Sequence, residues 1–226
     1  MNSPTTIELK NIDPEDIGDV LQKVAKSFSF QFGDSELKDV KTFGELCDIT
    51  ISKVEGDNCN DCTTQQAFDK VREAIAMKLN IEKSTLTVDT RLQELFPEKD
   101  RLKQIKVVES VLGFQTKVLR PKHWITTLLV LLLLAFFIVL FLYWRVGLLG
   151  LMFSIAGLFI SDRLSREFDI KTLGELAEKI AREHYKQVRR NPAKINRGEI
   201  TKKIKELFMK DLGLEENALT RETTFR

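Results

Sequence analysis

Apolar residues follow two patterns along this chain. The first is a continuous run from Trp124 to Ile160, thirty-seven residues that carry a single charge, Arg145. About 18 apolar residues are enough to suggest a bilayer-spanning helix, and dividing the run around Trp144 and Arg145 gives two helices of roughly 27 Å each. The run therefore predicts a transmembrane helical hairpin over residues 124–160. One long span followed by an interfacial segment is the alternative.

The second pattern is the three- and four-residue spacing of apolar side chains that is typical of amphipathic helices. It predicts helices over residues 13–30 and 100–112, and others that begin near Thr42 and near Thr63. The sequence Thr42-Phe43-Gly44-Glu45 has the form of a capping box, and residues 63–66 are a second expected helix start. A further helix near the C-terminus carries Ile200 and Ile204 on one face. The expected fold class is all-α, with small helical bundles plus the transmembrane hairpin.

Charge favours one side of the membrane for both flanks of the hairpin. The basic residues that flank the run are Lys117, Arg120, Lys122, Arg163 and Arg166. Basic residues stay on the cytoplasmic side, so we expect an integral membrane protein with both soluble parts facing the cytoplasm. The part up to Leu119 has a net charge of about −5 and the remainder about +7, which makes the two flanks electrostatically complementary.

Two segments recur in the same order. Residues 171–176, Lys-Thr-Leu-Gly-Glu-Leu, repeat residues 41–46, Lys-Thr-Phe-Gly-Glu-Leu, at an offset of 130. Residues 212–225 repeat residues 79–92 at an offset of 133. Because both matches keep their order across a three-residue change in length, we interpret them as internal repeats.

These segments resemble the acyl carrier proteins, which are small helical bundles. The spacing Val71-(x3)-Ile75-(x3)-Leu79-Asn80-Ile81, continuing to residue 92, is similar to helix I and the next loop of that family, as are residues 204–225. Residues 100–114 and 16–30 resemble helix II, and residues 41–48 and 171–176 resemble the entry to the last helix.

The order of these pieces predicts two carrier-like units. Residues 65–119 with 163–186 would form one unit, with the membrane hairpin inserted in one of its loops. Residues 1–54 with 195–226 would form a second, circularly permuted unit, and residues 55–64 a linker. Chain ends lie close together in many domains, which is why such rearrangements are tolerated.

The resemblance implies a serine at the start of helix II that carries a phosphopantetheine arm. Arg101 and Ile17 occupy that place here, so no hydroxyl is available there and no cofactor is expected. Ser35, in the sequence Asp34-Ser35-Glu36, would carry the arm under the alternative of a working carrier. Its place before the capping-box helix favours a helix-start or turn residue instead.

Other candidate chemistry is sparse. Cys59 and Cys62 lack a second pair of metal ligands, which favours a plain loop with free thiols over a metal or redox site. His184, between Lys179 and Lys186 in a helical pattern, is typical of solvated surface, and no catalytic set emerges.

A basic cluster is the clearest charged feature, either a solvated linker or a contact with anionic lipid headgroups. Its residues are Lys186, Arg189, Arg190, Lys194 and Arg197. Nucleic acid is not expected as a partner, because aromatic residues are absent from the cluster.

Together these patterns predict a membrane-anchored, non-enzymatic binding or docking module beside lipid or acyl-transfer machinery. Its expected partners are membrane lipids and a protein of acyl or lipid metabolism. Two alternatives stay open: a working acyl carrier modified at Ser35, and a structural membrane protein whose helices mediate oligomerisation.

Overall fold

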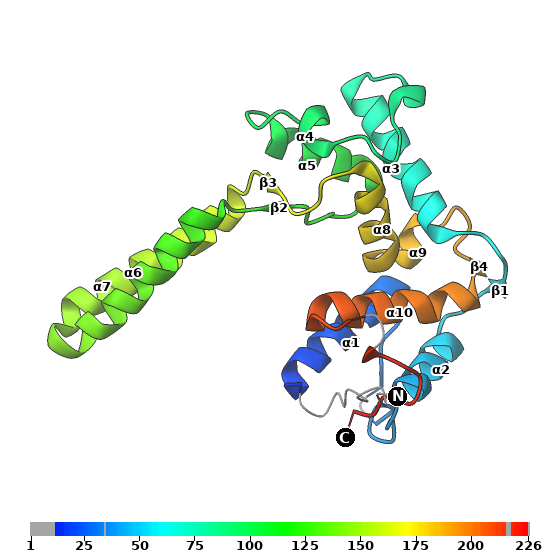
Figure 1. Ribbon diagram of the computed structural model, residues 1–226, viewed down its shortest axis with the longest axis horizontal. Coiled ribbons are helices and arrows are strands. Elements are labelled where there is room, and N and C mark those ends of the chain that lie inside the picture. The colour runs from blue at the N-terminus through cyan, green and yellow to red at the C-terminus, as the bar shows by residue number, and fades with distance from the viewer. Residues whose placement is uncertain (1–11, 34, 216–217, 226) are drawn as a thin grey trace, which may run out of the picture. The chain divides into compact units, whose positions relative to one another are not determined.

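The computed structural model describes residues 12–33, 35–215 and 218–225. Within these ranges the chain is mainly helical, with only two-residue strands, so the all-α prediction is confirmed (Figure 1). Two compact units are present, residues 1–70 with 177–226 and residues 71–176. We call them unit 1 and unit 2, and their boundaries fall within α3 (Thr63–Leu79) and α8 (Leu173–Glu183). The predicted carrier-like division, with its boundaries at 54, 65, 119, 163, 186 and 195, stays a prediction.

Unit 1 is built on three helices, α1 (Pro14–Phe28), α2 (Phe43–Lys53) and α10 (Arg197–Leu212), with the short α9 (Tyr185–Val188). The Asp13 side chain accepts a hydrogen bond from the Glu15 amide, and a proline follows at the first helical position, so α1 begins as predicted. Thr42 and Glu45 form the predicted capping box of α2. A parallel pair of two-residue strands, β1 (Asp57–Asn58) and β4 (Lys194–Ile195), joins the linker to the segment before α10.

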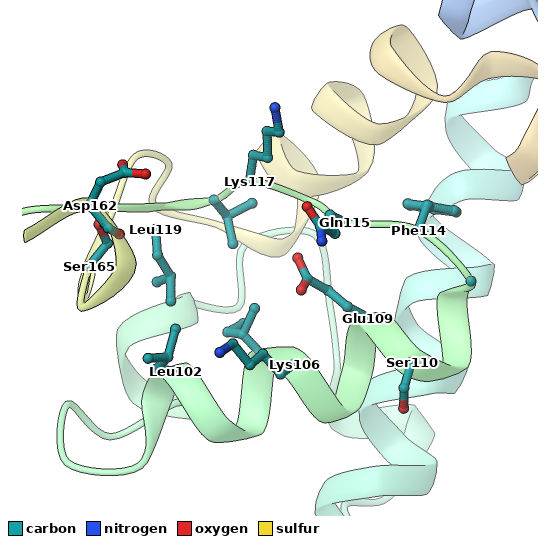
Figure 2. Close-up of a pocket in the computed structure, with 13 residues that line it drawn as sticks. Leu102, Lys106, Glu109, Ser110, Phe114, Gln115, Lys117, Leu119, Asp162 and Ser165 are labelled. Carbon is teal, nitrogen blue, oxygen red and sulfur yellow. The ribbon is translucent and has the colours of Figure 1, made fainter. Parts of the chain in front are cut away.

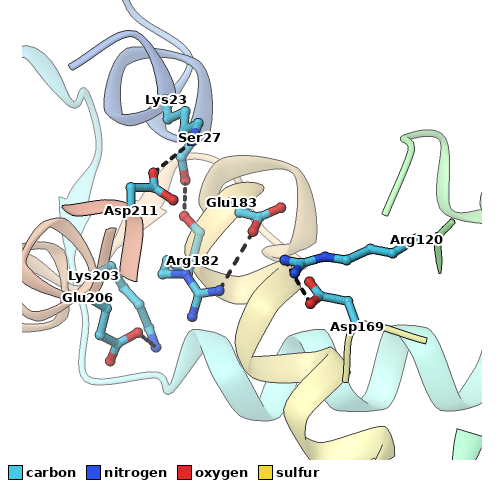
Figure 3. Close-up of polar contacts among 9 residues, drawn as sticks. All are labelled: Lys23, Ser27, Arg120, Asp169, Arg182, Glu183, Lys203, Glu206 and Asp211. Carbon is cyan, nitrogen blue, oxygen red and sulfur yellow. Dashed lines mark hydrogen bonds and ion pairs between the residues drawn. The ribbon is translucent and has the colours of Figure 1, made fainter. Parts of the chain in front are cut away.

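The core of unit 1 forms where α10 packs against α1 and α2. The side chains that are almost completely buried include Val24, Phe28, Leu46, Ile204 and Phe208. Burying one such side chain contributes roughly 1.5–3 kcal/mol, so helices that are far apart in the sequence stabilise one another here. At the rim, Lys23 Nζ of α1 pairs with Asp211 Oδ2 of α10 at 3.0 Å (Figure 3).

The C-terminal segment docks on the start of α2 through backbone hydrogen bonds. The Phe43 amide donates to Thr223 O at 2.9 Å, the Gly44 amide donates to Arg221 O at 2.8 Å, and the Phe225 amide donates to Lys41 O at 3.0 Å. Gly44 is required by this close approach, because a Cβ there would lie 2.9 Å from Arg221 O.

Unit 2 makes the corresponding contacts at the start of α8. The Leu173 amide donates to Thr90 O at 2.9 Å, and the Gly174 amide donates to Val88 O at 2.8 Å. The Leu92 amide, at the start of α4 (Leu92–Leu95), donates to Lys171 O at 3.0 Å. The remaining elements of this part are the 3₁₀ turn η2 (Lys83–Thr85) and α5 (Arg101–Leu112).

A helical hairpin leaves unit 2 through a two-stranded antiparallel ladder. Strand β2 (Leu119–Arg120) pairs with β3 (Glu167–Phe168), so the chain returns beside the point at which it left. Arg120 Nη2 and Asp169 Oδ1 form an ion pair at 2.7 Å, drawn in Figure 3, and Lys122 Nζ pairs with Glu98 Oε1 at 2.8 Å. The ladder and the Arg120–Asp169 pair hold the two ends of the hairpin together, and the Lys122–Glu98 pair ties the first end to the segment before α5.

The hairpin consists of α6 (His123–Leu142) and α7 (Trp144–Arg163), which lie side by side in Figure 1. Each helix has 20 residues, and both are long and apolar enough to cross a membrane. The predicted hairpin is confirmed, with its turn at Tyr143. Gly147 and Gly150 of α7 are buried against α6, where a Cβ on Gly147 would lie 2.3 Å from the Leu140 Cα. Small residues of this kind let two membrane helices approach closely.

Candidate functional site

An apolar pocket of about 320 Å³ opens in unit 1. It is formed by α1, the turn over residues 35–40, α2 and the C-terminal segment. The residues that line it are Ile12, Pro14, Ile17, Leu21, Leu37, Val40, Leu46 and Phe225. None of these side chains offers a hydrogen bond or a charge, so the pocket is suited to an apolar group.

Ser35 lies exposed in the turn that also carries Leu37, a side chain of the apolar pocket. The Glu36 carboxylate orders this turn by accepting from the Gly33 amide at 2.6 Å and pairing with Lys53 Nζ at 2.8 Å. The hydrogen bond from Lys53, followed by that from the Gly33 amide, holds the pKa of Glu36 below its ordinary value. The Ser35 side chain is therefore accessible, in a turn rather than at the start of a helix.

Arg101, in the place that the family resemblance assigns to a serine, is buried at the start of α5 with 7% of its surface exposed. Its Nε donates to Phe96 O at 2.9 Å, and its Nη1 donates to Arg166 O. The guanidinium carbon also lies 4.7 Å from the centre of the Phe168 ring. A buried cation with these partners holds the start of α5 to the segment that follows α7, so its role is structural.

Ile17, the other residue in the serine's place, is a half-buried side chain of α1. It packs against the core of unit 1 and lines the apolar pocket. Neither position presents a nucleophile.

The basic cluster divides between surface and interior. Arg190, Lys194 and Arg197 are exposed and Lys186 is half-buried, whereas Arg189 is only 5% exposed. Arg190 is tied to α3, because its Nη2 donates to Asp69 Oδ2 at 2.9 Å and its amide donates to Gln66 Oε1 at 2.8 Å. Arg189 is therefore not part of a lipid-facing surface in this structure.

Arg189 instead connects three segments of unit 1. Its Nη1 donates to Thr63 Oγ1 at 2.7 Å, its Nη2 donates to Cys59 Sγ at 2.9 Å, and its guanidinium lies over the Tyr185 ring. The same burial raises the pKa of the Tyr185 hydroxyl. Cys59 thus lies in a loop that a buried arginine holds in place.

The three cysteines Cys47, Cys59 and Cys62 are free thiols. Among the described residues, no group of three or more histidine, cysteine, aspartate or glutamate side chains is arranged to hold a metal ion.

His184 was expected on solvated surface, and this prediction is wrong. The residue is 9% exposed, with its Nδ1 2.8 Å from Gln187 Oε1, and the neighbouring Arg182 is 8% exposed. The end of α8 is covered by α1, where Ser27 Oγ donates to Arg182 O at 2.6 Å (Figure 3). Charged residues at helical spacing do not reveal that another helix covers them.

A second cavity, of about 780 Å³, lies in unit 2 between α5, residues 113–119 and the end of α7. We call it the hairpin-base pocket. In Figure 2, Leu102 and Lys106 of α5 point into it, as does Leu119 from the opposite wall. The Glu109 carboxylate also faces this space, and its Oε1 accepts from the Thr116 amide at 2.6 Å and from Thr116 Oγ1 at 2.8 Å.

Neither pocket was expected from the sequence. The apolar spacing of Ile17 and Leu21 indicates which face of α1 turns inward, but it does not show whether neighbouring side chains fill the space beside them. No local signal marks the hairpin-base pocket, because its walls come from segments far apart in the chain. Comparisons with protein-family models, curated proteins and solved structures find no match to this chain.

Proposed function

We propose that this chain is a membrane-anchored, non-enzymatic module that binds a fatty acyl chain without a covalent bond, beside lipid or acyl-transfer machinery. The observation that carries the proposal is the entirely apolar lining of the pocket in unit 1. Each methylene buried there contributes about 0.8 kcal/mol. The hairpin supports the proposal as well, since its two helices would anchor the module in a bilayer, which is rich in acyl chains.

Arg101 supports non-covalent binding over a carrier arm. Restoring a serine at this position would leave the Phe96 and Arg166 carbonyls without their donor, so the arginine is part of the framework of unit 2.

The matched hydrogen bonds support two carrier-like units with the permuted arrangement. The pairs 43–223, 44–221 and 225–41 in unit 1 correspond to 173–90, 174–88 and 92–171 in unit 2, with the same donors and acceptors. On this proposal the C-terminal helix supplies the first helix of the unit to which the N-terminal residues belong.

A photoreactive fatty acid tests the acyl-binding proposal in membranes. We expect a diazirine fatty acid to crosslink to residues 12–21 and 37–46 of the full chain, as mapped by peptide mass spectrometry. Ile17→Asp, in the pocket, should lower this crosslinking at least about fivefold, since it places a charge against the acyl chain. Ile49→Asp makes the same change at a half-buried position outside the pocket and should leave the crosslinking unchanged. Crosslinks confined to α6 and α7 would contradict the proposal.

The working carrier is the second candidate, favoured by the exposure of Ser35 in a turn that also lines the apolar pocket. Co-expression with a broad-specificity phosphopantetheinyl transferase separates the two. We expect the intact mass to stay unchanged, whereas an arm found on Ser35, and lost in Ser35→Ala, would replace our proposal with the carrier function.

We further propose that both soluble parts face the cytoplasm, as the basic flanks of the hairpin favour. In a background with Cys59→Ser and Cys62→Ser, which keeps only the buried Cys47, Ser84→Cys and Lys210→Cys made one at a time should be protected from a membrane-impermeant maleimide in intact cells. A cysteine at Tyr143, in the hairpin turn, should be labelled. Labelling at Ser84 or Lys210 would overturn this orientation.

A further inference from the structure

The hairpin-base pocket lies at a depth that the membrane anchor determines. Leu119 precedes the first residue of α6 by four positions, and Asp162 and Ser165, which also line the pocket, lie at the end of α7. Helices of 20 residues span about 30 Å, which matches the hydrocarbon thickness of a bilayer. If the hairpin spans the membrane, as the proposed function requires, this pocket opens in the headgroup layer.

The pocket is lined by apolar side chains, among them Leu102 and Leu119, and by four charged ones: Lys106, Glu109, Lys117 and Asp162. Lys106 and Glu109 lie near each other on α5. Leu102 and Leu119 face each other across the pocket, and Lys106 lies between Leu102 and Glu109 in Figure 2. Both hydrogen bonds from Thr116 fall on Glu109 Oε1, so among the described residues Oε2 stays available to a donor. The neighbouring cation and carboxylate on α5, beside apolar side chains, match a zwitterionic ligand with an apolar tail.

We propose that the hairpin-base pocket binds the head of a phosphatidylethanolamine molecule from the surrounding bilayer. The Lys106 ammonium pairs with the lipid phosphate, and Glu109 Oε2 accepts a hydrogen bond from the lipid ammonium. Leu102 and Leu119 contact the upper part of the acyl chains. Phosphatidylcholine has no N–H donor for Glu109, and phosphatidylglycerol lacks the positive charge, so both fit less well.

Lipid retention by the full chain tests this inference. The protein is placed in nanodiscs that contain equal amounts of phosphatidylethanolamine, phosphatidylcholine and phosphatidylglycerol, then transferred to mild detergent, and the retained lipids are measured by mass spectrometry. We expect phosphatidylethanolamine to be retained about fivefold over each of the others. Free phosphoethanolamine at millimolar concentration should not compete, because it lacks the acyl chains.

Matched variants on α5 locate the site. Lys106→Glu should abolish the preference, and Glu109→Gln, which keeps an acceptor for Thr116, should make phosphatidylethanolamine and phosphatidylcholine equivalent. Lys103→Glu, at an exposed position of α5 outside the pocket, and Glu73→Gln, at an exposed position of α3, should retain the preference. Circular dichroism checks that all four variants keep the helical content of the parent chain.

Three outcomes would overturn the inference. They are equal retention of the three lipids, an equal loss of the phosphatidylethanolamine preference in Lys106→Glu and Lys103→Glu, and displacement of the retained lipid by free phosphoethanolamine. Failure of the membrane anchor is recognised separately. A chain that alkaline carbonate releases from membranes would refute the anchoring itself, whereas a chain that stays in the membrane without a lipid preference refutes only this site. Crosslinking in the apolar pocket of unit 1 is independent of both results.

Discussion

Gly44 lies where the C-terminal segment meets the start of α2. A Cβ at this position would lie 2.9 Å from the carbonyl oxygen of Arg221, a backbone atom that cannot swing aside. Gly174 meets Val88 O in the same way, since a Cβ added to Gly174 would lie 3.0 Å from that oxygen. At the scale of single residues, these glycines determine how closely two backbone segments approach.

Gly44→Ala should therefore destabilise unit 1. We expect a loss of about 1–3 kcal/mol, because the added methyl group forces the hydrogen-bonded segments apart. Gly18→Ala in α1 is the matched control, since nothing lies within 4 Å of its Cβ, and an alanine inside a helix should stabilise it by about 0.5–1 kcal/mol. Urea unfolding of both variants in mild detergent measures the difference, and equal effects would contradict the account of Gly44.

Cys47 gives a pH dependence to the stability of unit 1. Burial raises the pKa of its thiol from 9.0 to about 12. The folded chain then holds the thiol proton more tightly than the unfolded chain does. The contribution of this thiol to the free energy of unfolding is complete below about pH 9. It is lost as the pH rises from 9 toward 12, by up to about 1.4 kcal/mol per pH unit.

Comparison of the parent chain with Cys47→Ala isolates this effect. Between pH 9 and pH 11 the free energy of unfolding should fall more steeply for the parent chain than for the variant. The buried Tyr185 is present in both chains, so its effect on the free energy of unfolding cancels in the comparison. Parallel curves for the two chains would show that Cys47 contributes nothing to the alkaline loss.

At the scale of elements, the hairpin depends on the small residues of α7. The buried Gly150 lies against the Phe136 ring of α6, where an added Cβ would be 2.1 Å from Cδ1. Gly150→Leu should separate the two helices without preventing membrane insertion, because the run stays apolar. Leu149→Ala, at an exposed position of α7, should leave the packing unchanged.

Spin labels on the exposed residues Leu134 and Met152 report this packing. We expect the distance distribution from pulsed electron resonance to broaden in Gly150→Leu and to stay narrow in Leu149→Ala. A narrow distribution in both variants would show that the glycine contact does not hold the hairpin together.

At the scale of the whole molecule, the two ends of the chain share one core. Phe208 of α10 is completely buried and its ring centre lies 5.5 Å from that of Phe43 in α2, while Leu207 and Ile204 pack in the same core as Val24 and Phe28. A single amphipathic helix of this length is marginal alone in water, so each end depends on the other.

Deletion of residues 198–226 should expose the N-terminal core. We expect faster hydrogen exchange at residues 21–28, while residues 71–112 of unit 2 keep their protection. Phe208→Ala should give a partial effect, with a loss of about 3–5 kcal/mol, and Lys202→Ala, at an exposed position of the same helix, should give none. Unchanged exchange at residues 21–28 after the deletion would show that the tail does not stabilise this core.

The sequence by itself determined the main helices, the capping box at Thr42 and the hairpin of two helices that are long and apolar enough to cross a membrane. These features are local: a helix shows its buried face in the spacing of its own apolar residues, and a span of about 18 apolar residues is visible without any partner. The turn at Tyr143, one position before the expected pair, is the usual uncertainty of an element boundary.

Only the tertiary structure decided which polar residues are buried and where cavities remain. Residues 63–66 were expected to cap their own helix, yet the Thr63 amide donates to the Glu199 carboxylate from α10 at 3.0 Å. The sequence places Arg189 in a basic cluster, whereas in the structure its guanidinium is buried against Thr63 and Cys59. Burial and cavities depend on contacts between segments that are far apart in the sequence, and the spacing of apolar residues within one element does not show such contacts.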